Sequence, residues 1–397
     1  MDLPADDVLS LRMTALLLSP SRPAAAPAIS PGPAEGAALG RGTGSPTSAA
    51  PAPDVAGVVT WLGAMQAQDL ASGLWSLGIR LPGASLAEVE AALEAGEVLR
   101  TWPMRGTVHF VPSRDARWMV EILGERPLAR ASSRRAVIGL DGAVADRAVD
   151  VLGEALAGGR RLTRAQCLET LATAGVPVPG QHGYHLLWYA SQRGVTCIAG
   201  SLGGEQAFAL LDDWAPDPHR PERDEALGII ALRYFRGHGP ATRQDFTHWT
   251  GLTAADARRG LAVAGDALTT VRSDGRELHL AADLLDQHRA APQHLGADDL
   301  LAVPGFDEYM LGFKDRALFL APEHLSAVVP GGNGIFRATL VRQGRVIGTW
   351  TRALDRGDVL VKPLPLVPLD STEQQALEDA WLPFARFHGA GLRVQWS

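Results

Sequence analysis

Two glutamines, Gln66 and Gln68, follow directly after the apolar segment VAGVVTWLGAM, whose pattern is typical of a helix. A carboxamide is a poor acid and a poor base, but it both donates and accepts hydrogen bonds. Residues two positions apart diverge on a helix and lie on the same side of an extended chain. If the two glutamines act together, the helix must end near Met65, and their chemistry is the positioning of a group rather than proton transfer. The alternative is two solvated side chains that close a helix.

A second set of residues has the chemistry to bind an anion. Eight arginines and three acids lie between Arg100 and Arg135, a local net charge of +5, whereas the whole chain has a net charge of −7. In a strand, Arg105 and His109 have equal parity and share a face, where arginines can contact DNA phosphates. The alternatives are a solvated helix face for the arginine run and a half-buried, hydrogen-bonded His109. We predict DNA contacts at Arg100, Arg105, His109, Arg114, Arg117, Arg272 and Arg276.

Other catalytic signatures are weak. The sequence contains no HExxH, no cysteine pair with metal-ligand spacing, no P-loop and no GxSxG. His182 and His185 would share a helix face, but no third ligand is near them in the sequence, so we expect neither a metal nor a cofactor. Cys167 and Cys197 are expected to be packed thiols, with a disulfide between them as the alternative.

The segment VPGFDEYMLGFKDR, at residues 303–316, is dense in charged groups between aromatic residues. Its charged residues either form a salt-bridged domain junction, which we favour, or face a substrate; they are Asp307, Glu308, Asp315 and Arg316.

The composition limits the class of protein that carries these residues. A chain of 397 residues is too long for one ordinary core, and 46% hydrophobic with 20% charged residues is typical of soluble globular proteins. No run of eighteen apolar residues occurs, so we expect no membrane span. The start MDLPADDVLS lacks the basic region of a secretory signal, and we expect a cytoplasmic, nucleoid-associated protein. Residues 19–53 are mostly Ala, Pro, Gly, Ser and Thr, which predicts a flexible insertion.

Three stretches share one layout, in which a helix-start signal leads through helices to two β-rich runs around a turn. Their predicted caps, Ser85, Thr163 and Thr242, are 78 and 79 residues apart. Helices followed by a β-hairpin are typical of the winged helix, and the alternative is an unrelated α+β domain. After residue 298 the pattern is β-rich with one helical stretch.

We therefore predict an α+β protein with three tandem winged-helix (helix-turn-helix) units followed by a C-terminal β-barrel-like domain. The expected boundaries are 1–124 (with the insertion at 19–53), 125–222, 223–297 and 298–397.

The motif MQAQD resembles the Gln-x-Gln motif of the winged-helix DNA glycosylases of the AlkZ/YcaQ type. The segments WPMRGTVHFVPSRDARWM, GPATRQDFTHWTGLT, GFDEYMLGFKDR and NGIFRATLVRQGRVIGTW resemble other recurrent stretches of that family, in the same order. The resemblance covers nearly the whole chain outside residues 19–53, which depart from the family pattern.

The resemblance implies a C-shaped arrangement of three winged helices and a β-barrel around double-stranded DNA. It implies a monofunctional glycosylase that removes N7-alkylated purines and unhooks interstrand crosslinks, with Gln66 and Gln68 positioning the attacking water. We expect the protein to be a monomer. The Gln-x-Gln branch is associated with self-resistance to DNA-alkylating natural products, and the motif does not separate that role from general repair.

The implied chemistry suits two carboxamides. A purine alkylated at N7 carries a positive charge, so it is a good leaving group without a general acid, and the remaining task is to hold a water at C1′. The alternative function is a non-enzymatic winged-helix DNA-binding protein, such as a transcription regulator.

Overall fold

Local sequence signals set several helix starts in the computed structural model, which describes residues 1–19, 54–296, 299–332, 334–355 and 357–396. The three predicted caps form capping boxes: Ser85 with Glu88, Thr163 with Gln166, and Thr242 with Asp245. In each box the two residues accept each other's backbone N–H groups, which would otherwise lack partners at the helix start. Of the predicted insertion at 19–53, all but Ser19 lies outside the described residues.

Four predicted hairpins turn at two-residue loops in which both residues have positive φ. Such loops match the right-handed twist of the strands on either side. The loops are Arg105-Gly106, Gly203-Gly204, Asp274-Gly275 and Gln343-Gly344. An arginine at positive φ is uncommon, and Arg105 has a φ of 55°.

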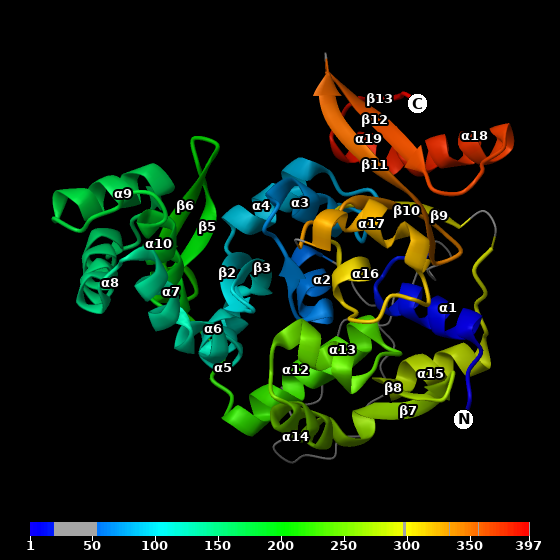
Figure 1. Cartoon of the computed structure of the whole chain (residues 1–397), viewed down its shortest axis with the longest axis horizontal. Helices are drawn as coiled ribbons and strands as arrows, with labels where there is room; N and C mark the ends of the chain where they lie inside the picture. Colours follow the sequence, from blue (N-terminus) through cyan, green and yellow to red (C-terminus); the bar gives the residue numbers. More distant parts are fainter. Residues whose placement is uncertain (20–53, 297–298, 333, 356, 397) are drawn as a thin grey trace, which may run out of the picture.

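Figure 1 shows the order of the elements along the chain. Up to residue 124 they are α1 (Ala5–Ala15), α2 (Val55–Leu62), β1 (Met65–Gln66), α3 (Leu70–Gly78), α4 (Leu86–Glu94), β2 (Val98–Met104), β3 (Thr107–Pro112) and α5 (Ala116–Leu123). From 125 to 222 they are α6 (Glu125–Ala129), α7 (Ala131–Ile138), α8 (Gly142–Leu156), β4 (Leu162–Thr163), α9 (Arg164–Thr173), α10 (His182–Gln192), β5 (Thr196–Leu202), β6 (Glu205–Leu210) and α11 (Leu211–Trp214).

The second half of the chain also contains both helices and strands. From 223 to 297 the elements are α12 (Arg223–His238), α13 (Arg243–Thr250), α14 (Ala254–Ala264), β7 (Leu268–Ser273), β8 (Arg276–Ala281) and α15 (Ala282–Ala290). From 298 onward they are β9 (Leu300–Val303), α16 (Glu308–Leu311), α17 (Leu325–Val328), β10 (Ala338–Arg342), β11 (Arg345–Asp355), β12 (Asp358–Pro365), α18 (Ser371–Ala380), α19 (Leu382–Phe387) and β13 (Gly391–Val394). The predicted α+β class is confirmed.

Within the described ranges, the strands form three sheets. The first two hairpins join into one six-stranded sheet of order β1-β3-β2-β5-β6-β4, and β7-β8 stay a separate pair. The junction between β2 and β5 places Arg100 opposite Ile198. The C-terminal sheet, of order β13-β12-β11-β10-β9, is curled into a half-barrel rather than closed into the predicted barrel, and Figure 1 places it far from α8 and α9.

The even spacing of the three caps does not align equivalent elements. Ser85 begins α4, the helix that leads directly into its hairpin. Thr163 and Thr242 instead begin the first of two helices that precede a hairpin. The cap signal marks a helix start and carries no information about which helix of a unit it starts, so the regular interval is no measure of a structural repeat.

The first helix packs far from its neighbours in sequence. Apolar residues of α1, including Val8 and Leu11, form a small cluster with Leu278 and Leu280 of β8. The Leu3 N–H also donates to the Arg272 carbonyl at 2.7 Å. A larger cluster of buried apolar residues extends from Leu9 to Phe387 and joins all four predicted segments through one core.

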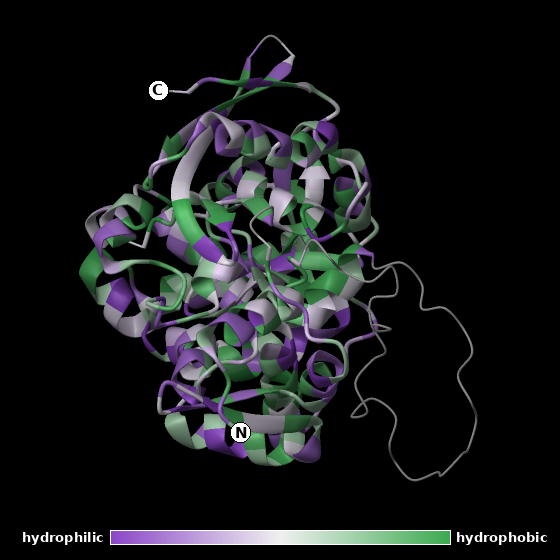
Figure 2. Cartoon of the chain, turned by 90° about the vertical axis from the view of Figure 1, so that its right-hand side faces the viewer, coloured by the Kyte–Doolittle hydropathy of each residue, from purple (hydrophilic) through white to green (hydrophobic). Residues whose placement is uncertain are grey.

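Most helices carry both apolar residues, which pack in the core, and polar residues. In Figure 2 hydrophobic and hydrophilic residues alternate along most of the helices. Among the described residues, no helix has the length and apolar character needed to cross a bilayer.

Candidate active site

The helix before the two glutamines ends earlier than the sequence pattern predicts. α2 stops at Leu62, where Gly63 adopts a φ of 86°, a conformation that favours glycine. The chain is then extended, and Met65 and Gln66 pair as β1 with Phe110 and His109 of β3. The predicted change from helix to extended chain at the glutamines is therefore present, three residues before Met65.

The two carboxamides have different surroundings. Gln66 is buried, with 8% of its surface exposed, whereas Gln68 is exposed. The Gln68 Oε1 accepts the backbone N–H of Val108 at 3.3 Å. The Gln66 carboxamide forms no hydrogen bond with any residue that the structure describes, so its donors and acceptor are available to a ligand. That both carboxamides hold one water remains a prediction.

A buried carboxylate lies on the other side of β1. The Ala67 N–H donates to the Val108 carbonyl of β3 at 2.9 Å, whereas the Gln66 N–H points away and donates to Glu308 Oε1 at 3.0 Å. The second oxygen, Oε2, accepts the Trp249 Nε1–H at 2.8 Å and lies 3.3 Å from His238 Nε2. Burial alone would raise the pKa of Glu308, but the hydrogen bond and charge of His238, with the Gln66 N–H, lower the pKa to about 2.

The loop that carries Glu308 is held by its neighbour. Asp307 receives two hydrogen bonds from the Arg80 guanidinium, at 2.7 and 2.9 Å, and both side chains are fully buried. Asp307 also accepts the Tyr309 N–H at 2.8 Å and caps α16. The predicted salt-bridged junction is thus present at Asp307, while Glu308, one residue later, contacts the glutamine strand.

His109 lies opposite Gln66 in the sheet and is completely buried. Its Nδ1 lies 2.9 Å from the Thr107 carbonyl, which can only accept, so Nδ1 carries the proton and Nε2 has no partner among the described residues. Burial, with the nearby charge of Arg105, lowers the pKa of His109 from 6.5 to about 4. The imidazole is therefore neutral at pH 7.

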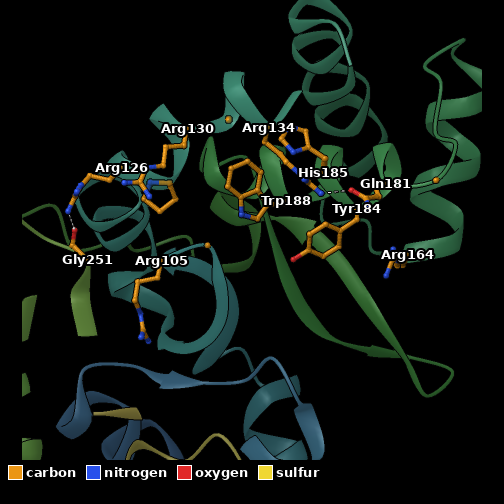
Figure 3. A pocket seen from close by; sticks show the side chains of 14 residues that line it. Arg105, Arg126, Arg130, Arg134, Arg164, Gln181, Tyr184, His185, Trp188 and Gly251 are labelled. Carbon is orange, nitrogen blue, oxygen red and sulfur yellow. Dashed lines mark hydrogen bonds between the residues drawn. The ribbon is translucent and has the colours of Figure 1, made fainter. Parts of the chain in front are cut away.

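Figure 3 shows an arginine-lined pocket of about 730 Å³, which includes Arg105, the residue whose charge acts on His109. Its wall includes the Arg105-Gly106 turn of the first hairpin, helices α6, α7 and α10, and the start of α9. Trp188 and Tyr184 provide aromatic surface between the arginines, as Figure 3 shows. Five arginines line the pocket: Arg105, Arg126, Arg130, Arg134 and Arg164.

The pocket is strongly positive. None of its lining residues is acidic, and none of the five arginines forms an ion pair with a residue in the described part of the chain. Arg126 donates to the Gly251 carbonyl at 2.7 Å, and Arg134 donates to Gln181. Both partners are neutral, so the positive charges are not compensated, and an anion is the ligand that this wall favours.

Only Arg105 of the predicted DNA contacts lies in this pocket. Arg100 is 7% exposed and His109 is fully buried, so duplex DNA cannot reach His109 in this structure. Arg117 pairs with Asp212, and Arg276 pairs with Asp315 at 2.5 Å, so both charges are already compensated. Arg114 and Arg272 are exposed and lie outside the pocket.

The sequence did contain a signal for part of the pocket. Arg126, Arg130 and Arg134 recur every four residues, a spacing that places side chains on one face of a helix. Glu308, His238 and Trp249 had no comparable signal, because each is far from the glutamines in sequence and meets Gln66 only through the fold.

Metal ligation has little support from the geometry. In the portion of the chain that the structure describes, no group of three potential ligands comes together. His182 Nε2 lies 2.8 Å from the Ile138 carbonyl, and His185 is buried. Cys167 and Cys197 are free, buried thiols, as expected, rather than a disulfide.

Comparisons with known proteins match this chain along most of its length. The family model described as DNA glycosylase AlkZ-like matches residues 59–387. An interstrand DNA cross-link repair glycosylase of Streptomyces sahachiroi is 28% identical over 346 residues, which cover 82% of this chain and 89% of the relative. The solved structure of the Streptomyces sahachiroi DNA glycosylase AlkZ is similar with a TM-score of 0.76 and 24% identity, covering 100% of both chains, and this likeness supports the fold.

Proposed function

The chain belongs to the DNA glycosylase AlkZ-like family, whose model matches residues 59–387, and from this premise we propose that it removes N7-alkylated purines from double-stranded DNA and unhooks interstrand crosslinks. As a DNA glycosylase it hydrolyses N-glycosyl bonds. The crosslink part of the proposal is supported by the relative from Streptomyces sahachiroi, which is a cross-link repair glycosylase. The family match favours this enzyme over a non-enzymatic winged-helix regulator.

The observation that carries the proposal is the state of Gln66: a buried carboxamide, held on an extended strand, with no described partner. Such a group is ready to bind a water and needs little reorganisation to do so. We assign the attacking water to Gln66 and Gln68. The N7-alkylated purine leaves with its own positive charge neutralised, so the step needs a water held at C1′ more than it needs an acid.

The nearby titratable groups fit a mechanism based on positioning. Glu308 has its pKa lowered to about 2, so it is a weak base at neutral pH, and its oxygens already accept hydrogen bonds. His109 is neutral at pH 7, but its Nε2 is buried. We therefore expect the carboxamides to orient the water, and the proton that the water loses on attacking C1′ to pass to bulk solvent, which reaches the exposed Gln68.

We assign the DNA backbone to the arginine-lined pocket. Five uncompensated arginines in one concave wall suit phosphate oxygens, and Arg105 belongs both to this wall and to the charge environment of His109. A phosphodiester in the pocket would therefore lie beside the glutamine strand. The aromatic surface of Trp188 and Tyr184 suits the planar part of a base or adduct.

We further infer that the three helix-and-hairpin segments act as winged helices. The support is that α3–α4, α9–α10 and α13–α14 each precede a two-stranded hairpin. The first two hairpins share one sheet, whereas β7-β8 forms a two-stranded sheet of its own.

The deciding experiment uses two substrates. A duplex with a single N7-methylguanine is incubated with excess enzyme, and abasic sites are revealed by alkaline strand cleavage. A duplex crosslinked between guanine N7 atoms by a nitrogen mustard is examined on a denaturing gel. We expect excision from the first and strand separation of the second. A protein that binds both duplexes tightly and releases neither base would contradict the proposal.

A further inference from the structure

The strand that carries Gln66 is unusually short and lies at the edge of its sheet. β1 has two residues, and among the described residues its one sheet neighbour is β3. Because backbone N–H groups alternate in direction along a strand, the Gln66 N–H faces away from β3, where a further strand would normally supply a carbonyl. In this protein the acceptor at that place is the carboxylate of Glu308, 242 residues later in the chain.

We propose that Glu308 is a positioning residue for Gln66, and that its carboxylate fixes the outer edge of β1 so that the Gln66 carboxamide meets the attacking water in one orientation. This inference rests on the proposed role of Gln66.

The Glu308 carboxylate is itself rigidly held. Trp249 Nε1 donates to its second oxygen at 2.8 Å, and His238 Nε2 lies 3.3 Å from the same oxygen. The side chain is 1% exposed, so bulk solvent has little access to these contacts. A hydrogen bond to an ionised acceptor is stronger than one to a carbonyl, so the anion holds the Gln66 backbone more firmly than a neighbouring strand would.

The surrounding loop leaves the carboxylate little freedom to move. Residue 307 is tied to Arg80 by two hydrogen bonds in the core, and Phe306, one residue earlier, has a φ of 57°. A non-glycine residue at positive φ persists only where neighbouring contacts impose it. The segment therefore brings Glu308 to β1 as a fixed support.

The matched variants are Glu308→Gln and Asp115→Asn. Glu308→Gln keeps the shape of the side chain but offers one acceptor oxygen where two donors, from Gln66 and Trp249, need one each. Asp115 is another fully buried carboxylate, paired with Arg233 at 2.6 Å, and it forms no hydrogen bond with Met65 or Gln66 of β1. Asp115→Asn thus controls for the loss of a buried charge as such.

The assay is single-turnover excision of N7-methylguanine, run well below the melting temperature of each variant, with duplex affinity measured in parallel. We expect Glu308→Gln to slow excision roughly ten- to a hundredfold, the range caused by a displacement of about 1 Å at a catalytic group, with duplex affinity unchanged within about twofold. In a Gln66→Ala background the same substitution should cost less than about threefold, because no carboxamide is left to position.

Each other outcome has a definite meaning. A full and independent loss in the Gln66→Ala background, or an equal loss in Asp115→Asn, would overturn the positioning role while leaving the glycosylase proposal intact. Wild-type excision by Gln66→Ala would instead contradict the assignment of the water to Gln66. If Glu308→Gln does not fold, Trp249→Phe is used instead, because it removes one hydrogen bond to the carboxylate. A loss of excision rate in Trp249→Phe that disappears in the Gln66→Ala background supports the inference. An unchanged excision rate in Trp249→Phe contradicts it.

Discussion

Replacing the two glutamines one at a time should give unequal losses. The Gln66 carboxamide is 8% exposed, and its backbone is held by β3 on one side and Glu308 on the other. Removal of such a preorganised contact costs about 2.7–4 kcal/mol, so Gln66→Ala should slow excision roughly 100- to 1000-fold. Gln68 is exposed and its oxygen accepts a 3.3 Å hydrogen bond. An exposed contact contributes about 0.5–1.5 kcal/mol, which gives a loss of roughly two- to tenfold for Gln68→Ala.

The measurement is the single-turnover rate on a duplex with one N7-methylguanine, at enzyme concentrations that saturate the DNA. Duplex affinity should stay near that of the parent protein, because phosphate contacts dominate binding. The double variant should lose less than the product of the single losses if both carboxamides hold one water. Wild-type excision by the double variant would refute the assignment, and a larger loss at Gln68 than at Gln66 would refute the argument from burial.

Four further outcomes are expected. Arg126→Ala with Arg130→Ala should flatten the salt dependence of duplex affinity by about 0.9 log unit per lost phosphate contact, whereas Arg345→Ala, which pairs with Asp6, should leave the slope unchanged. Borohydride should trap no covalent DNA adduct on a lysine, because the only lysines of the sequence, Lys314 and Lys362, lie after residue 297, outside the segments proposed to be winged helices; an adduct mapped to either one would contradict this. Arg80→Leu leaves Asp307 buried without its ion-pair partner and should lower the free energy of unfolding in urea by about 3–5 kcal/mol, whereas Arg393→Ala at an exposed pair should leave it nearly unchanged. Because the pKa of His109 is lowered from 6.5 to about 4, the unfolded chain binds its proton first as pH falls, so the melting temperature should drop between pH 6.5 and 4, and His109→Asn should show a smaller drop over that window.

Features with a local cause could be predicted from the sequence. Asp274-Gly275 and Gln343-Gly344 turn the chain because glycine readily adopts positive φ at the second position of a two-residue loop, and both signals lie within two residues. The capping box at Thr163 depends only on residues three positions apart. The change from helix to extended chain before Gln66 also has a local cause. The helix ends just before Gly63, however, and not near Met65 as the sequence predicted.

Features with a long-range cause could not be predicted in the same way. The joining of β2 to β5 brings together residues such as Arg100 and Ile198, and nothing in either strand specifies the other. The burial of His109 follows from packing on both sides of the sheet, which a strand pattern of one hairpin does not reveal. The contact between the Glu308 carboxylate and the Gln66 N–H depends on the fold. Neither residue type predicts it from the sequence.

The long separation between Gln66 and Glu308 also orders events during synthesis of the protein. The two residues are 242 positions apart, and a ribosome adds about 5–20 residues per second, so roughly 12–48 s pass between their appearance in the growing chain. Over this time the pocket arginines, all before Glu308, emerge while the edge of β1 still lacks its carboxylate. Under the proposed roles, the arginines that would bind DNA are therefore synthesised before the carboxylate that would fix the glutamine strand.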